Sequence, residues 1–231
     1  MIWPPRGCPD ATTLLKFRRR LETHDLCQGL FAAINADLTA RGLLLREGTL
    51  VDATLIAAPP STKNQAKQRD PEMHQAKKGN QWYFGMKAHI GADRDSTLVH
   101  TVVVTAANVA DITQAAELLH GDEKQVHADA GYTGVEKRAE IVALERKIDW
   151  QIAGKRGTIK AMAEGAEKET RKAMEKAKAA VRAFVEHPFH IVKNLFGHRK
   201  VRYRGLAKNG HQLYTLFGLA NVVSGGRTPT T

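Results

Sequence analysis

The pattern of apolar and polar positions begins with two amphipathic segments. The opening MIWPPRGCP has no periodicity and predicts an unstructured lead-in, after which Asp10 is placed to cap a helix. The apolar residues of that helix recur at helical spacing: Leu14, Phe17 and Leu21. A second helix is predicted from about residue 25 to residue 41, where Gly42 ends it. Its apolar stripe consists of Leu30, Ile34 and Leu38. Residues 1–47 are therefore predicted to form a short helical region.

Further along the chain the periodicity changes to that of strands. Residues 49–56 are rich in β-branched side chains, which predicts a strand that Pro59 and Pro60 end. Residues 61–80 are polar, basic and short of apolar anchors, so we expect a mobile loop. More strands are predicted at 82–90, 97–105, 125–128 and 149–153. The turn between the first two of these contains Asp93 and Asp95, which we interpret as turn residues.

Helices are predicted between and after these strands. The first is capped by Asn108 or Asp111 and continues to about residue 119. Others are predicted at 135–146, at 159–186, and around Leu213, Phe217 and Ala220. This succession of strands followed by alternating helices and strands is typical of an α/β layer around a mixed sheet, and it matches the ribonuclease H-like arrangement. We expect one such domain over residues 48–231.

The positive charge of the chain is gathered at one end. The formal net charge is +11, yet residues 1–150 carry 19 basic and 19 acidic side chains. Residues 151–231 carry 16 basic and 5 acidic side chains, and no acid follows Glu186. A surplus of this kind favours a polyanionic partner, because phosphate contacts release condensed counterions. The alternative is a charge that serves solubility. A nucleic acid is the better interpretation.

The cysteines and the hydropathy exclude several classes of protein. Cys8 and Cys27 form no metal-binding or redox pair, and we expect two reduced thiols. His187 and His190 lack partners at zinc-binding spacing. No apolar run is long enough to span a bilayer, and the N-terminus has no signal-peptide pattern. We therefore expect a cytoplasmic protein with no membrane partner.

Three carboxylates are candidates for metal-assisted phosphoryl transfer. Asp52 lies in the middle of a predicted strand, where a charge is costly unless it is paired or metal-bound. Asp129 ends another strand just before a glycine-containing turn, and ligand sites commonly lie at strand ends. Glu186 lies on a helix among cations. Each has a plainer interpretation: Asp52 as an ion-paired residue, Asp129 as a turn acid, and Glu186 as a surface glutamate. The residues alone leave these alternatives open.

A resemblance to a known family bears on this choice. Five segments in the same order carry it: VDATLIAAPPSTKNQ, DPEMHQAKKGNQWYFGMKAHIG, HADAGYTG, VEHPFHIVK and KVRYRGLAKNGHQLYTLFGLANV. Together they resemble the DDE transposases of the insertion-sequence-five type, over nearly everything from residue 10 to residue 224. In that family the three acids lie in the segments that here contain Asp52, Asp129 and Glu186. The resemblance implies that these carboxylates are catalytic and hold two divalent ions, Mg²⁺ or Mn²⁺.

The same resemblance implies that the chain acts on DNA. The third acid lies in an Arg-x3-Glu-x6-Lys pattern, so Arg182 and Lys193 are expected to approach DNA. Both also have local explanations, Arg182 as an i,i+4 partner of Glu186 and Lys193 as a solvated side chain. The remaining DNA-contacting candidates are Lys77, Lys78, Arg199, Lys200, Arg202 and Arg204. Trp82 beside Lys77 and Lys78 is placed to stack on an unpaired base.

The expected activity is cleavage of DNA at the ends of an insertion sequence, followed by strand transfer to target DNA. The expected partners are the terminal repeats and target DNA, with a homo-oligomer in the DNA complex left open.

The pattern departs from the family in two places. Ala179 stands where neighbouring families carry a tyrosine, and the N-terminal segment that family members use to bind terminal repeats is not recognisable, which predicts a truncated copy. A catalytically inactive DNA-binding remnant is therefore the alternative, and a host nuclease of the same fold is a weaker one. Pro188 predicts a kink or a helix restart beside Glu186.

Overall fold

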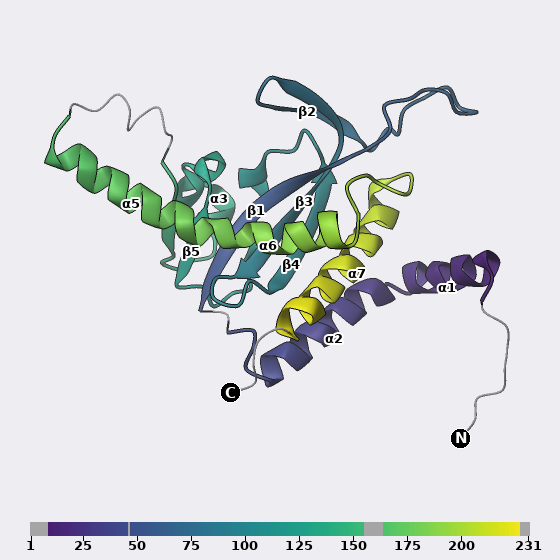
Figure 1. Ribbon diagram of the computed structural model, residues 1–231, viewed down its shortest axis with the longest axis horizontal. Coiled ribbons are helices and arrows are strands. Elements are labelled where there is room, and N and C mark those ends of the chain that lie inside the picture. The colour runs from purple at the N-terminus through teal and green to yellow at the C-terminus, as the bar shows by residue number, and fades with distance from the viewer. Residues whose placement is uncertain (1–8, 46, 155–163, 227–231) are drawn as a thin grey trace.

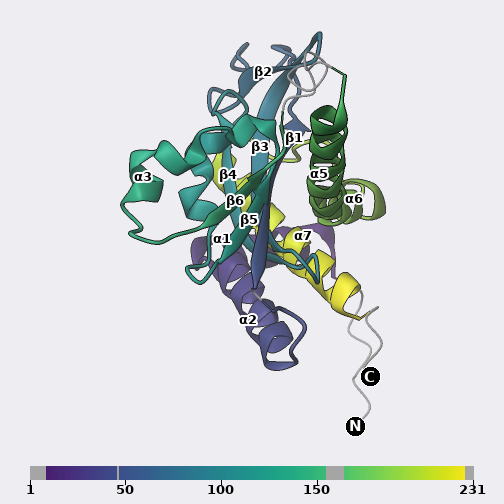
Figure 2. The ribbon, with the colours of Figure 1, turned by 90° about the vertical axis from the view of Figure 1, so that its left-hand side faces the viewer.

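A computed structural model describes residues 9–45, 47–154 and 164–226 of the chain. A six-stranded mixed sheet lies between helices on its two faces (Figures 1 and 2). This confirms the expected α/β, ribonuclease H-like fold, with a short helical segment before the first strand. Most of the predicted lead-in, residues 159–163 of the predicted long helix, and the last five residues of the basic C-terminal segment lie outside the described residues.

The strands form the central layer of the molecule. They are β1 (Gly48–Ala57), β2 (His74–Lys78), β3 (Gln81–Asp93), β4 (Val99–Ala106), β5 (Gln125–Ala128) and β6 (Asp149–Ile152). The path across the sheet is β2-β3-β1-β5-β6, and β4 pairs with β3 beside β2. β1 is antiparallel to β3 and parallel to β5, and β5 is parallel to β6. β1 therefore lies at the centre, where the antiparallel and parallel parts of the sheet meet.

Helices and short helical turns cover the sheet. The regular helices are α1 (Ala11–Thr23), α2 (Leu26–Ala40), α3 (Ala139–Val142), α5 (Ala166–Arg182), α6 (Glu186–His190) and α7 (Leu206–Gly225). The 3-10 turns are η1 (Asp111–Gln114), η2 (Ala116–Leu118), η3 (Ala130–Tyr132), η4 (Val135–Lys137) and η5 (Ala183–Val185), and η6 (Ile191–Leu195) is a π turn. Figure 2 shows α5 and α6 on one side of the sheet and α3 on the other.

The alternation of side chains along β1 builds two cores. Leu50 and Ile56 are fully buried in the larger core, which also contains residues of α6 and α7. Val51 points the other way, into the core that contains Tyr132 and the short turns. Because side chains on a strand alternate between faces, Asp52 shares the face of Leu50 and Ile56. The strand therefore carries the Asp52 carboxylate beneath the α5–α6 layer.

The expected loop over residues 61–80 is wrong at its end, where β2 forms. Residues 74–78 pair with β3 in an antiparallel hairpin, in which Lys77 faces Trp82. Gly79 turns the hairpin with φ +62, a conformation that suits glycine. β2 was missed because the side chains of this strand are mostly exposed, so it carries no apolar alternation. Its backbone hydrogen bonds to β3 define it, and they leave little trace in the sequence.

Two predicted helices are replaced by short turns. Between β4 and β5 the chain forms only η1 and η2, and Asp111 pairs with Lys87 at 2.8 Å instead of capping a helix. The hydroxyl of Thr113 donates to the carbonyl of Ala110, a local bond that competes with regular helix. The predicted helix at 135–146 is interrupted because Arg138 adopts an extended conformation between η4 and α3.

The N-terminal helices form where they were expected. Asp10 caps α1 by accepting a hydrogen bond from the backbone N–H of Thr13 at 2.6 Å. Yet α1 buries none of its residues. In α2 the predicted stripe was partly wrong, because Leu30 is exposed. The side chains buried from this helix are Cys27, Phe31, Asn35 and Leu38. That face packs on α7, where Asn221 donates to the side chain of Asn35 at 2.8 Å.

The last helix and the turn after β3 agree with their predictions. α7 buries Leu213, Phe217 and Ala220 as predicted. Asp93, the last residue of β3, stabilises the turn that contains Asp95, because its carboxylate accepts from the backbone of Asp95 and Ser96. In the part of the chain that the structure describes, no helix is long and apolar enough to cross a membrane.

The buried His89 should make the fold sensitive to acid. Burial is the main cause that lowers the pKa of His89 from 6.5 to about 4; Lys87 lowers it further and Asp111 opposes the shift. The unfolded chain therefore takes up this proton at a higher pH than the folded chain does. Stability that is fully present above pH 6.5 should fall as the pH drops towards 4, by up to about 3 kcal/mol.

Urea unfolding at a series of pH values measures this dependence. His89→Gln keeps a polar partner for Thr105, which lies 2.8 Å from the imidazole, and should remove this part of the acid sensitivity. The same substitution at the exposed His24 is the control and should leave it in place. An unchanged pH profile in His89→Gln would contradict the assignment.

Candidate active site

Two of the three candidate acids come from the adjacent parallel strands at the centre of the sheet. Leu50 of β1 is paired with His127 of β5. Asp52 and Asp129 each follow two residues later, so the register brings them level on the same face. Neighbouring strands lie about 4.8 Å apart. The parallel pairing of β1 and β5 therefore brings these two positions into the same neighbourhood, with Asp129 just beyond the last residue of β5, and the charge of Asp129 acts on Asp52.

Each of the two aspartates is oriented by a backbone N–H group. The Oδ1 of Asp52 accepts from the N–H of Ala53 at 2.7 Å, and the Oδ1 of Asp129 accepts from the N–H of Gly131 at 2.8 Å. A Cβ at Gly131 would lie 2.9 Å from the Asp129 Oδ1, closer than real Cβ contacts. The glycine thus lets the Asp129 carboxylate fold over its turn. One oxygen of each aspartate is held by the backbone in this way.

Glu186 is carried by a helix restart. α5 ends at Arg182, the 3-10 turn η5 follows, and Glu186 is the first residue of α6. This confirms the break that Pro188 predicts and corrects the prediction of one helix through residue 186. The restart keeps Val185 and Phe189 buried in the main core, while 65% of the Glu186 side chain stays exposed. Buried neighbours in the chain therefore fix the position of Glu186, whose own side chain lies exposed at the edge of the site.

Arg182 joins the strand to the helix restart. One guanidinium nitrogen, Nη2, lies 3.4 Å from the Oδ2 of Asp52 and 3.5 Å from the Oε1 of Glu186. The i,i+4 pairing of Arg182 with Glu186 is therefore present, and the same side chain also reaches the acid on β1. A single cation thus lies between two of the candidate carboxylates.

The electrostatics of Asp52 link all three acids. Burial is the main cause that raises the pKa of Asp52 from 3.8 to about 6. The backbone N–H of Ala53 and the charge of Arg182 lower the pKa, and the charges of Asp129 and Glu186 raise it. Asp52 is 8% exposed. The site is therefore a place where negative charges repel one another around a buried carboxylate, and where a cation is favoured.

The model of the transposase DDE domain family matches residues 44–222. The chain belongs to the transposase DDE domain family. No solved structure matches it. Members of this family act on DNA in transposition and generally use divalent metal ions.

The donor atoms of the site suit such an ion. Hard divalent cations prefer carboxylate oxygens, and Asp52, Asp129 and Glu186 supply them from three different elements. Arg182 already stands between two of these acids as a positive charge. Among the described residues, no three His, Cys, Asp or Glu side chains are close enough together to hold a metal ion. The residues thus fit such an ion in chemical type and charge, although their side chains are not gathered around a single point in this structure.

Several basic residues named from the sequence lie beside Glu186. Lys78, Lys193 and Arg199 line an open cleft of about 460 Å³ that Glu186 also lines. The Nζ of Lys193 donates to the carbonyl of Leu55 on β1 at 2.9 Å, so Lys193 is tied to the sheet and is only partly solvated. Thr54, His190 and Asn194 complete the polar lining of the cleft. None of these three was predicted to line the site, since His190 was considered only as a zinc ligand. Only Thr54 carried a signal, because it lies two residues after Asp52 in a strand.

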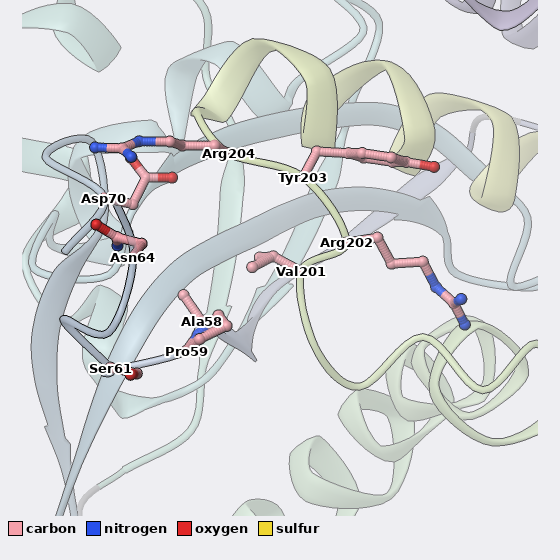
Figure 3. A pocket seen from close by; sticks show the side chains of 9 residues that line it. All are labelled: Ala58, Pro59, Ser61, Asn64, Asp70, Val201, Arg202, Tyr203 and Arg204. Atoms are coloured by element: carbon pink, nitrogen blue, oxygen red, sulfur yellow. The ribbon is translucent and has the colours of Figure 1, made fainter. Parts of the chain in front are cut away.

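The other basic candidates lie elsewhere. Arg202 and Arg204 line a separate pocket of about 210 Å³ with Asp70, Asn64 and Ser61 (Figure 3). Figure 3 shows Arg204 extending to the Asp70 side, whereas Arg202 and Tyr203 extend the other way. Lys200 forms an isolated bridge with Ala57 at the end of β1. The exposed Lys77 and Trp82 form a cross-strand pair on the hairpin.

Removing Arg182 should raise the pKa of Asp52 further. The charge of Arg182 stabilises the ionised form of Asp52, so the pKa in Arg182→Ala should lie above the value of about 6 in the native protein. Carbon-detected NMR titration of the aspartate carboxyls, without divalent ions, measures it. Arg202→Ala removes a charge that lines the other pocket and serves as the control. A pKa of Asp52 that stays the same or falls in Arg182→Ala would show that the ion pair does not form in solution.

Proposed function

We propose that this chain is a transposase of the insertion-sequence-five type that cleaves a DNA strand at the end of its element and joins the freed 3′-hydroxyl to target DNA. Asp52, Asp129 and Glu186 are the proposed catalytic residues and metal ligands. The observation that carries the proposal is the position of Arg182 between Asp52 and Glu186. In this arrangement Asp52, on the central strand, and Glu186, at the start of α6, both lie close to the guanidinium of Arg182.

The proposed site would hold two divalent ions, Mg²⁺ or Mn²⁺. Asp52 and Asp129 would hold the shared ion and Glu186 would complete the second position. Bound ions of this kind supply Lewis-acid activation of the attacking oxygen and charge stabilisation of the leaving oxygen. The family's general use of divalent ions supports this assignment, as does the hard-oxygen donor set.

The chain's own residues orient the acids and the DNA. The N–H groups of Ala53 and Gly131 fix one oxygen of each aspartate, and the other oxygen of Asp52 faces the guanidinium of Arg182, whose place a metal ion would take. Burial of Asp52 keeps water away from its carboxylate, so its charge acts at low dielectric. Arg182 is free to turn to a DNA phosphate once another cation neutralises Asp52 and Glu186. Its planar guanidinium suits bidentate contact with phosphate.

Removing any one of the three acids should abolish metal-dependent cleavage. Asp52→Asn, Asp129→Asn and Glu186→Gln each replace a charged ligand with a neutral amide. Changes to outer-shell partners typically cost 10–100-fold, so we expect losses beyond about a hundredfold here. Nicking of supercoiled plasmid with Mg²⁺ or Mn²⁺ measures the activity. Glu167→Gln, at an exposed position of α5, is the matched control and should keep full activity.

The same assay separates the proposal from its alternative, a catalytically inactive DNA-binding remnant. A remnant would bind DNA and show no nicking with either ion. Nicking that persists in all three acid variants would instead place the catalytic residues elsewhere.

Cleavage by this chain should depend little on DNA sequence. On this proposal the basic residues at the site contact phosphates, and such contacts position DNA without reading bases. The rate should therefore be similar on DNA with and without the element's terminal repeats, and a comparison of the two substrates measures it. Cleavage that is efficient only on repeat-containing DNA would show that the chain has base-reading contacts outside the cleft.

A further inference from the structure

In the lining of the cleft beside Glu186, basic side chains outnumber acidic ones. Lys78 comes from β2, Lys193 from η6 and Arg199 from the segment after it. Glu186 is the single acid in its described lining. The pKa of Lys193 is lowered, mainly by burial and then by the charges of Lys78 and Arg199, and Glu186 opposes the shift. Three cations that repel one another across an open cleft are stabilised by an anion that enters it.

Two of these cations are held in place by the protein. Arg199 donates from Nε to the carbonyl of Lys193 at 3.3 Å and from Nη2 to the side chain of Asn194. A guanidinium has five N–H donors, so further donors remain for a ligand. Lys193 is anchored on the carbonyl of Leu55. The cleft thus presents a partly preorganised arginine and a lysine fixed to the sheet, which lowers the ordering cost of binding.

The cleft continues directly from the proposed catalytic residues. Thr54 lines it and lies two residues after Asp52 on the same face of β1. Two residues along a strand cover about 6.6 Å, which is close to the separation of successive phosphates in a DNA strand. Glu186 is both a proposed catalytic residue and part of the lining of this cleft. A strand whose scissile phosphate lies at Asp52 and Glu186 would therefore bring a neighbouring phosphate into the cleft.

Two other charged hollows have less of this surplus, or none. The cleft between β6 and α5 contains Lys124, Lys147 and Arg171, but also Glu136, Asp149 and Glu175. The pocket of Arg202 and Arg204 contains Asp70. In the first of these the charges balance, and in the second Asp70 accepts a hydrogen bond from the backbone N–H of Gly205 at 2.7 Å, which holds an acid in the pocket.

We propose that this cleft is a phosphodiester subsite in which Lys78 and Arg199 contact one and the same phosphate, next to the scissile one, while Lys193 is a positioning residue. The inference rests on the proposed function, because that function makes the ligand a DNA strand. The inference adds that two segments, the tip of the β2–β3 hairpin and the segment after η6, both bind the same phosphate of the DNA strand. Arg202 and Arg204 have no part in this contact.

The experiment is equilibrium binding of a fluorescent DNA duplex at several salt concentrations, in chelator and without divalent ions. Each phosphate contact contributes about 0.9 to the slope of log affinity against log salt. Lys78→Ala and Arg199→Ala should each weaken binding but leave the slope nearly unchanged, because the remaining cation still neutralises the shared phosphate. The double variant should reduce the slope by about 0.9, since the phosphate then has neither partner. Lys147→Ala, an exposed lysine in the charge-balanced cleft, should leave the slope unchanged.

Two results would overturn the subsite. An unchanged slope in the double variant would remove the phosphate from the cleft. A loss of about 0.9 in each single variant and about 1.8 in the double variant would mean two separate phosphates. The binding assay needs no cleavage, so its outcome is distinct from that of the acid variants. If Asp52→Asn abolishes nicking while Lys78→Ala and Arg199→Ala bind normally, the proposed function stands and the subsite fails. If nicking is absent from the native chain but the slopes change as expected, the subsite stands and the catalytic assignment fails.

Discussion

A carboxylate in the middle of the central strand is the constraint on which the rest of the site depends. Asp52 lies among buried apolar neighbours in β1, where an ionised group is costly without compensation. The compensation comes from two elements: the backbone N–H of Ala53 in β1 and Arg182 at the end of α5. The turn after β5 adds a second acid, Asp129, whose charge repels that of Asp52 and so favours a further cation. The break after Arg182 then brings Glu186 to the same guanidinium. One buried charge thus explains why these segments meet at this point.

Much of this arrangement could be predicted from the sequence where side chains carry the information. The alternation in β1, the glycine near Asp129 and the proline after Glu186 each have a direct physical consequence, and the strand, the turn and the helix break follow from them. The bounds of the short turns could not be predicted, because apolar residues at helical spacing also suit 3-10 turns packed on a sheet. β2 could not be predicted either, since it is defined by backbone pairing with β3.

The separation of the basic residues into two places was also beyond the sequence. Arg199 and Arg202 are three residues apart, yet they line different hollows, because the segment between them is held to the end of β1 and to α7. The N–H of Val201 donates to the carbonyl of Ala57, and the side chain of Asn209 accepts from the backbone of Arg202. These contacts join residues far apart in the chain. A count of charges along the sequence therefore predicts a nucleic-acid partner but not where each cation lies.

The break between α5 and α6 has a mechanical consequence. Arg182 is the last residue of α5 and Glu186 the first of α6, so the two partners of this ion pair belong to different helices. α6 is fixed in the main core by its buried Phe189 and by Val185 of η5 just before it, whereas α5, among its described residues, buries only Lys168. The turn η5 thus connects α6, which is fixed in the core, to α5, which has few buried side chains. A displacement of α5 would move the guanidinium of Arg182 away from Asp52 and Glu186, while Glu186 itself would keep its position against the sheet.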